Sequence, residues 1–170
     1  IKELVWHEDA FAIGFNFGLL TSLVKLDMSV EKASGYRNGS FMASTNGMLL
    51  LEELNMRNNL LARNGDNGNV TTLDLSWQGR LKKLDVRGTG LVKLQLATGA
   101  PVVRLCIPDT IEELFLEYLT RLPESGLVLE GISNVTGYRF AECPGIDGFA
   151  LLERLHAARR NGIGRLERFR

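Results

Sequence analysis

The feature that most constrains this chain is a six-residue phrase that recurs along it. Each copy has an apolar residue, two variable residues, Leu, one variable residue and a further apolar residue. Four clear copies are Leu51–Met56, Val70–Leu75, Leu91–Leu96 and Ile111–Leu116. Recurrence at a period of roughly 20–30 residues is the sequence signature of a solenoid. The chain is therefore expected to coil into stacked turns, each contributing the same short element.

Each phrase predicts one strand. Its Leu and its last apolar residue are two positions apart, and because alternate side chains of a strand share a face, both should point into the core. Leu73 and Leu114 are expected to be buried for this reason. Stacking the phrases predicts one parallel sheet in which equivalent positions form lanes across the strands. The phrases begin at Ile1, Leu23, Leu51, Val70, Leu91, Ile111, Val135 and Ile163.

The connecting segments differ from turn to turn. The phrase also occurs at half the period, at Leu81–Val86 and Val102–Ile107. These copies predict strands on the return side, and hence a flattened coil with sheet on both faces. After Cys143 a helical face of Phe149, Leu151, Leu152 and Leu155 is expected, with Asp147 capping its start and Gly162 ending it. The predicted fold class is thus α/β, with strand, loop and helix in the return segments.

Composition argues against a nucleic-acid partner and against a membrane span. The 170 residues suffice for one domain, and twenty basic residues balance twenty acidic ones. A net charge near zero provides no field that would attract phosphate backbones, so a nucleic-acid partner is not expected. No apolar run reaches the roughly 20 residues of a membrane span. Because residues 1–170 begin and end inside a phrase, we expect about seven repeats cut from a longer protein.

The phrases resemble those of the leucine-rich-repeat family, and the half-period copies resemble nested repeats of its bacterial surface proteins. In that family an Asn or Cys three residues after the last apolar position bonds backbone at the corner. Asn59 and Cys143 occupy this place, whereas Gln78, Gly99 and Leu119 depart from it. The resemblance implies a binding scaffold, with a location at the cell surface or outside the cell. It does not imply a particular partner.

No set of residues indicates catalysis or a bound cofactor. Two histidines and two cysteines offer no pair at metal-ligand spacing, and no phosphate-binding glycine loop is present. Cys143 is expected to be buried at its corner. Cys106 lies between two core residues on a return strand, so it is expected to face outward as an inert surface thiol. We predict that these residues form no enzyme active site.

The exposed lanes of the sheet are the expected binding surface. One lane reads Val5, Asp27, Asn55, Asp74, Gln95, Phe115, Arg139 and Glu167. Large aromatic residues on an exposed face are typical of interface anchors, although they can also cover a neighbouring repeat. The residues predicted to bind a partner are Phe115, Tyr118, Trp77, Arg139, Gln95 and Asp74.

Three functional hypotheses follow from a repeat scaffold without a catalytic set. The first is a recognition or adhesion module of a bacterial surface-associated or secreted protein, which binds a protein or a glycan along its sheet. The second is a structural component of an assembly such as a phage virion, with neighbours stacked on the solenoid ends. The third is a repeat domain that selects substrates for an enzyme or effector whose catalytic domain lies elsewhere.

Overall fold

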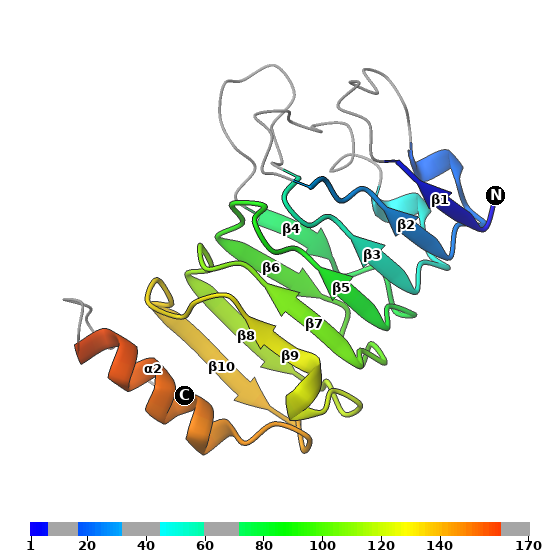
Figure 1. The fold of residues 1–170 in the computed structure, drawn as a ribbon. Coiled ribbons are helices and arrows are strands. Elements are labelled where there is room, and N and C mark those ends of the chain that lie inside the picture. Colours follow the sequence, from blue (N-terminus) through cyan, green and yellow to red (C-terminus); the bar gives the residue numbers. More distant parts are fainter. Residues whose placement is uncertain (7–16, 32–44, 60–71, 161–170) are drawn as a thin grey trace.

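In the computed structural model the chain forms a β-solenoid of about five turns, described over residues 1–6, 17–31, 45–59 and 72–160. Two parallel sheets lie on opposite sides of one core (Figure 1). The six-stranded sheet contains, in spatial order, β1 (Glu3–Val5), β2 (Lys25–Asp27), β3 (Glu53–Asn55), β5 (Lys83–Asp85), β7 (Arg104–Ile107) and β9 (Leu127–Leu129). The predicted solenoid of parallel strands is confirmed.

The four-stranded sheet covers the other side of the core. Its strands are β4 (Thr72–Leu75), β6 (Lys93–Leu96), β8 (Glu113–Glu117) and β10 (Gly137–Ala141), in that spatial order. Three 3-10 turns complete the connections that the structure describes: η1 (Phe17–Leu19), η2 (Thr45–Gly47) and η3 (Glu124–Gly126). The helix α2 (Gly148–Arg160) follows β10 at the end of the stack away from β1 (Figure 1).

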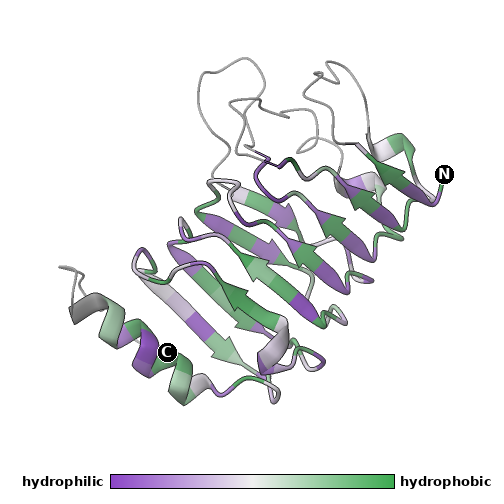
Figure 2. Ribbon diagram, viewed as in Figure 1, coloured by the Kyte–Doolittle hydropathy of each residue, from purple (hydrophilic) through white to green (hydrophobic). Residues whose placement is uncertain are grey.

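The core is built from leucines held in register. Leu26, Leu54, Leu84 and Leu105 are direct neighbours along the six-stranded sheet, and each is at most 2% exposed. Leu73 and Leu114 are buried on the other sheet, as predicted. Apolar and polar residues alternate along many of the strands (Figure 2). Burial of each such leucine stabilises the fold by roughly 1.5–3 kcal/mol before the entropy of ordering it is counted.

The prediction of one continuous main sheet is wrong. The phrases at Ile1, Leu23 and Leu51 form β1, β2 and β3, which share a sheet with β5 and β7. The phrases that begin at Val70, Leu91, Ile111 and Val135 form the opposite, four-stranded sheet. Both sheets bury the same phrase positions, so the pattern itself does not say on which side a copy lies. The two return strands predicted at half-period, β5 and β7, are confirmed.

The end of the chain that follows β10 matches its prediction in part. Asp147 caps α2, because its Oδ1 accepts hydrogen bonds from the N–H groups of Phe149 and Ala150, both at 3.0 Å. Leu151 and Leu155 join the core, and Leu152 packs against it. Phe149 is 73% exposed, so its place on the buried face was wrongly predicted. Gly162 and the phrase at Ile163 lie outside the described residues.

Within the described ranges, the only α-helix is neither long nor apolar enough to cross a membrane.

Candidate functional site

Four of the six residues predicted to bind a partner lie on the four-stranded sheet, and the other two directly follow its strands. Asp74, Gln95, Phe115 and Arg139 occupy equivalent outward positions on β4, β6, β8 and β10. The register pairs Asp74 with Gln95 and Phe115 with Arg139. Trp77 and Tyr118 follow β4 and β8 where the chain leaves the sheet. We call this set the aromatic face: Asp74, Trp77, Gln95, Phe115, Tyr118 and Arg139.

The rest of the predicted lane does not belong to the aromatic face. Val5, Asp27 and Asn55 lie on β1, β2 and β3, in the opposite sheet. Glu167 falls outside the described residues. The predicted lane was therefore too long, because it joined positions that the core separates.

Phe115 stands at the centre of the aromatic face between two cations. The Lys93 Nζ lies 5.8 Å from the ring centroid and the Arg139 Cζ lies 5.7 Å from it. Cation–π contacts of this kind contribute about 0.5–1 kcal/mol each at exposed sites. The ring remains 37% exposed. Lys93 and Arg139 thus hold the phenyl group on the surface and leave part of it available for contact.

Both cations are themselves paired with carboxylates. Lys93 Nζ lies 2.6 Å from Glu113 Oε2, and Arg139 Nη1 lies 3.4 Å from Glu117 Oε1. These pairs join neighbouring strands, but exposed ion pairs contribute only about 0–1 kcal/mol to folding. Their larger effect is geometric, because they fix both cations beside the ring.

A hollow of about 270 Å³ opens beside Phe115. Side chains of four chemical kinds line it: the ammonium of Lys93, the amide of Gln95, the hydroxyl of Thr98 and the carboxylate of Glu117. The hollow therefore combines hydrogen-bond donors and acceptors with an aromatic ring, and three leucines line the rest of it. Such a hollow suits a polar group with both donors and acceptors better than a purely apolar one.

Tyr118 owes its position to an unusual backbone conformation. Its φ is 58°, in the left-handed region, and its N–H donates to the Ala141 carbonyl at 2.9 Å. The same position in other turns holds Asn58, Gly88 and Glu142, all with positive φ. Sequence reasoning missed this corner because only Gly88 carries the residue type that normally marks it. The turn leaves the Tyr118 side chain 47% exposed.

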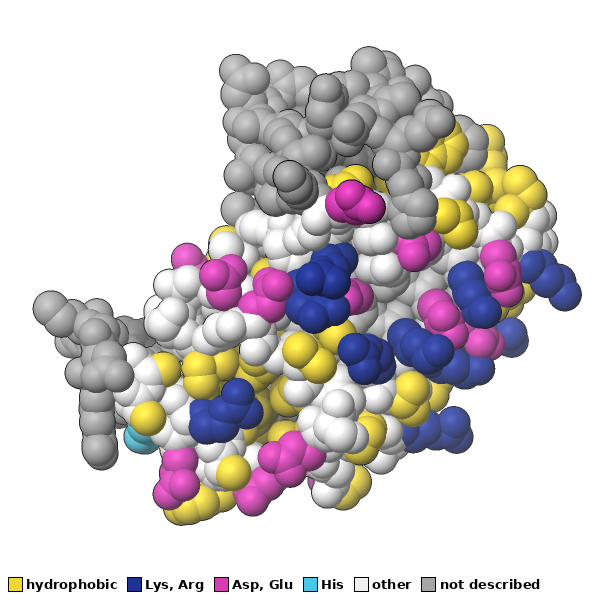
Figure 3. Space-filling model, viewed as in Figure 1, with side chains coloured by type: hydrophobic (Ala, Val, Ile, Leu, Met, Phe, Trp, Pro, Cys, Tyr) yellow, Lys and Arg dark blue, Asp and Glu magenta, His cyan; other side chains and the backbone are white. Residues whose placement is uncertain are grey.

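The six-stranded sheet presents a second surface, on which no partner-binding residue was predicted. Its outer lane alternates in charge: Glu3, Lys25, Glu53 and Lys83 occupy successive strands, and Arg104 follows. Lys25 Nζ lies 3.2 Å from Glu3 Oε1, and Lys83 Nζ lies 2.9 Å from Glu53 Oε1. The hydrogen bond and the charge of Glu3 raise the pKa of Lys25. We call this row of residues the charge ladder; acidic and basic groups interleave over these strands (Figure 3).

The charge ladder borders a shallow groove of about 350 Å³. Beside it runs a row of hydrogen-bonded polar groups, in which Asn55 Nδ2 donates to Asp27 Oδ2 at 3.1 Å. Ser29 donates to Asp27 Oδ1 from its N–H at 2.9 Å and from its hydroxyl at 2.7 Å. The groups in this row satisfy one another, which favours a structural role for them.

Cys106 is not the surface thiol that the sequence predicted. It lies on the outer side of β7, yet it is fully buried. Asp85 is its direct neighbour on β5, and the charged Arg87 and Arg104 act on the thiol electrostatically. Burial raises the pKa of Cys106. A protonated, enclosed thiol is chemically inert, so the predicted lack of reactivity has a different cause from the one expected.

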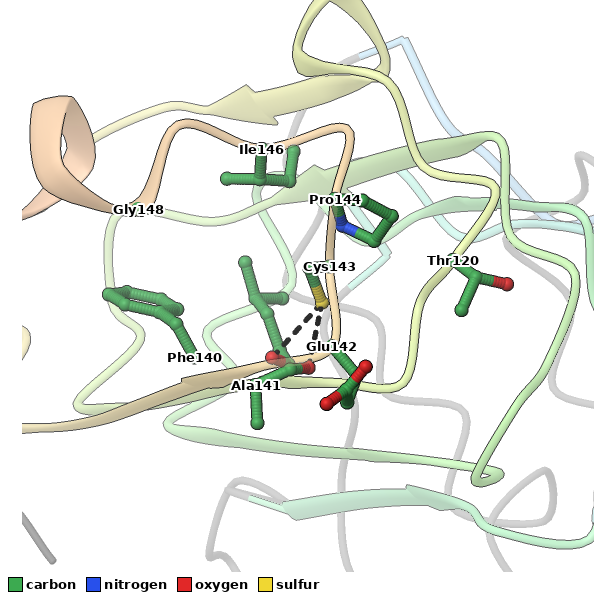
Figure 4. Close-up of a pocket in the computed structure, with 9 residues that line it drawn as sticks. Thr120, Phe140, Ala141, Glu142, Cys143, Pro144, Ile146 and Gly148 are labelled. Atoms are coloured by element: carbon green, nitrogen blue, oxygen red, sulfur yellow. Dashed lines mark hydrogen bonds between the residues drawn. The ribbon is translucent and has the colours of Figure 1, made fainter.

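Cys143 occupies a corner, as predicted, but it is only half-buried. Its Sγ donates toward the Leu116 carbonyl at 3.2 Å, with the Ala141 carbonyl at 3.3 Å (Figure 4). Burial raises the pKa of this thiol too. Asn59 acts similarly at its own corner, where its Nδ2 donates to the Met28 carbonyl at 2.9 Å. Both side chains therefore tie one turn to the turn before it.

The corner at Cys143 adjoins a cavity of about 440 Å³ between β10 and the start of α2. Thr120, Phe140, Glu142 and Ile146 are among the residues around it (Figure 4). The Cys143 thiol, the Glu142 carboxylate and the Thr120 hydroxyl are the polar side-chain groups around it. The raised pKa of the thiol makes it a poor nucleophile.

The described part of the chain contains no group of three or more His, Cys, Asp or Glu placed to hold a metal ion. No protein-family model, curated protein or solved structure matches the chain.

Proposed function

We propose that this domain is a non-enzymatic recognition module that binds a protein or a glycan through its aromatic face. The observation that carries the proposal is the placement of Phe115, whose ring has Lys93 and Arg139 within cation–π distance and remains partly exposed. Aromatic side chains with limited conformational freedom are the usual anchors of binding surfaces.

Two further features support binding on this side. Trp77 and Tyr118 are 62% and 47% exposed near the margins of the same surface, where an apolar ring gains most from being covered. The hollow beside Phe115 supplies an amide, a hydroxyl and both signs of charge. Such a mixture favours a partner surface rich in hydrogen-bonding groups.

The likeness to leucine-rich repeats is part of the same proposal. The recurring phrase supports it, and so do the backbone bonds that Asn59 and Cys143 make at two corners. A location at the cell surface or outside the cell is proposed on that likeness alone.

Affinity capture with the full chain as bait tests the proposal. Soluble and surface extracts are passed over wild-type protein, Phe115→Ala, Trp77→Ala and the matched control Val103→Ala. Val103 is 39% exposed and precedes β7 on the opposite sheet. A specific partner should bind wild type and the control alike. Truncation of an anchor typically weakens binding about tenfold or more.

Circular dichroism of each variant keeps loss of binding separate from loss of fold. A specific partner that binds folded Phe115→Ala and Trp77→Ala as tightly as wild type would show that the aromatic face is not the binding surface.

A further inference from the structure

The hollow beside Phe115 is built by two neighbouring strands and the turn that follows one of them. β6 contributes Gln95, and its neighbour β8 contributes Phe115. Thr98 follows β6 in a β-turn of residues 97–100, in which the first carbonyl accepts a hydrogen bond from the last N–H at 3.1 Å. Gly99 supplies the positive φ of this turn, 72°, without steric cost. All three side chains therefore reach the hollow from hydrogen-bonded backbone.

Two polar side chains of the hollow are available to a ligand. Gln95 and Thr98 are both exposed, and neither side chain makes a hydrogen bond within the described part of the chain. The amide offers two donors and an acceptor oxygen, and the hydroxyl both donates and accepts. Both groups can therefore bond a ligand without breaking a bond inside the protein.

The charges around the hollow are already neutralised. Lys93 pairs with Glu113 and Arg139 pairs with Glu117 across neighbouring strands. The outward side chains of the four-stranded sheet that carry a charge are Asp74, Lys93, Glu113, Glu117 and Arg139. They include no excess of positive charge that would attract an anionic ligand. A cationic ligand would compete with Lys93 and Arg139 for the same carboxylates, so the pattern favours an uncharged ligand.

The same charges argue against a protein as the occupant of the hollow. The centres of protein interfaces are depleted of charged residues and rich in apolar contact area. Phe115 is the one aromatic side chain at the outward positions of β4, β6, β8 and β10, and charged groups surround it. A sugar ring needs less apolar area, because it has C–H groups on its face and hydroxyls around its rim. Those hydroxyls can bond amide, hydroxyl and carboxylate groups alike.

On the basis of the function proposed above, we infer that this hollow binds one sugar unit of an uncharged glycan. The C–H face of the sugar packs on the exposed part of the Phe115 ring. Its hydroxyls bond the Gln95 amide, the Thr98 hydroxyl and the Glu117 carboxylate. The hollow of about 270 Å³ is smaller than the roughly 300–1,000 Å³ typical of pockets for drug-sized ligands, which suits a single sugar unit.

Binding of the purified full chain to defined sugars tests the inference. The probes are immobilised neutral oligosaccharides of glucose, galactose, mannose and N-acetylglucosamine, with heparin and polygalacturonate as anionic probes. At least one neutral probe should retain the wild-type protein, and neither anionic probe should. Affinity for the neutral probe should change less than about twofold between about 0.05 and about 0.5 M salt, because salt screens interactions between charges.

Substitutions locate the sugar. Phe115→Ala should weaken binding about tenfold or more, because it removes the ring on which the sugar packs. Gln95→Ala and Thr98→Ala should weaken it about three- to tenfold each, because each removes hydrogen bonds to the ligand. Both residues are exposed, so their truncation leaves the core unchanged. The matched control is Thr72→Ala, an exposed threonine of β4 outside the hollow, which should bind as wild type does.

Nuclear magnetic resonance places the sugar directly. The side-chain amide resonances of Gln95, assigned by their loss in Gln95→Ala, should shift when the retained neutral oligosaccharide is added to wild type. Circular dichroism of each variant checks that it is folded.

Three results would overturn the inference. The first is that no neutral probe binds at millimolar concentration. The second is retention by the anionic probes alone. The third is binding of a neutral probe that Gln95→Ala and Thr98→Ala leave unchanged.

Two further outcomes separate the glycan from the aromatic face itself. A captured protein partner that Phe115→Ala releases, together with no binding of neutral sugars, would exclude the glycan and leave the aromatic face as the binding surface. A specific partner that binds Phe115→Ala and Trp77→Ala as tightly as wild type would exclude the aromatic face.

Discussion

Leu84 and Leu4 occupy the same register position in the same sheet and differ chiefly in the number of neighbouring strands. Leu84 lies on β5 between β3 and β7 and is 1% exposed. Leu4 lies on the end strand β1 and is half-buried. Replacing each with Ala removes the same atoms. The difference between the two losses in unfolding free energy therefore reports how deeply each leucine is buried.

The two costs should differ clearly. Truncating the fully buried Leu84 to Ala should destabilise the fold by about 3 kcal/mol. The lost transfer free energy of the side chain adds to the free-energy cost of the cavity left behind. The half-buried side chain of Leu4 has less transfer energy to lose on truncation, and its removal leaves a less enclosed space. Leu4→Ala should therefore cost about 1 kcal/mol.

Thermal and urea unfolding followed by far-ultraviolet circular dichroism provide the assay. For a chain of this length 1 kcal/mol corresponds to about 2–4 °C in Tm, so Leu84→Ala should lower Tm by about 6–12 °C and Leu4→Ala by about 2–4 °C. The urea m-value should stay constant if the solenoid unfolds as one unit. If Leu4→Ala cost as much as Leu84→Ala, the half-burial of Leu4 would not determine the cost and the reasoning would be refuted.

Two further perturbations test local features. Gly126→Ala would place its Cβ 2.2 Å from the Val103 carbonyl oxygen, a backbone atom that cannot move aside alone, so it should destabilise the fold by about 1–3 kcal/mol in urea titrations. Gly79→Ala meets nothing within 4 Å and should change stability by about 0.5 kcal/mol or less. Burial raises the pKa of Cys106 and Cys143, so Ellman's reagent at neutral pH should label both slowly in native protein and rapidly in urea. Because the native state favours the protonated thiols, their contribution to stability should decline as pH rises above about 8.5, and fast native labelling at pH 7 would contradict both assignments.

The recurring phrase predicted the solenoid because its spacing reports burial directly. Leu73 and Leu114 are buried for the reason that the pattern states, and β5 and β7 lie where the half-period copies placed them. The side of the core on which each copy lies was not predictable, since both sheets use the same phrase. β9 was missed because Leu127–Leu129 has apolar residues at successive positions and no recognisable phrase.

The candidate site, like the fold, was predicted only in part. Outward positions could be identified from the period of two, so Phe115 and Arg139 were correctly placed on one face. Their mutual contact and that of Lys93 depend on side-chain conformation across strands, which no spacing reports. Cys106 shows the opposite error: its outward position was predicted correctly, but charged neighbours on the sheet surface bury it.

The outer faces of the two sheets differ in which side chains remain available for contact with a partner. On the six-stranded sheet, Lys25 and Lys83 are neutralised by Glu3 and Glu53 on adjacent strands, so the ladder holds its own strands in register. Among the described strands, this row of ion pairs begins with Glu3 on β1, which pairs with Lys25 on β2. On the four-stranded sheet the paired charges surround Phe115, and the group left for contact is a ring. The ring and the charge ladder therefore lie on different sheets, and substitution of Phe115 leaves the ion pairs of the ladder in place.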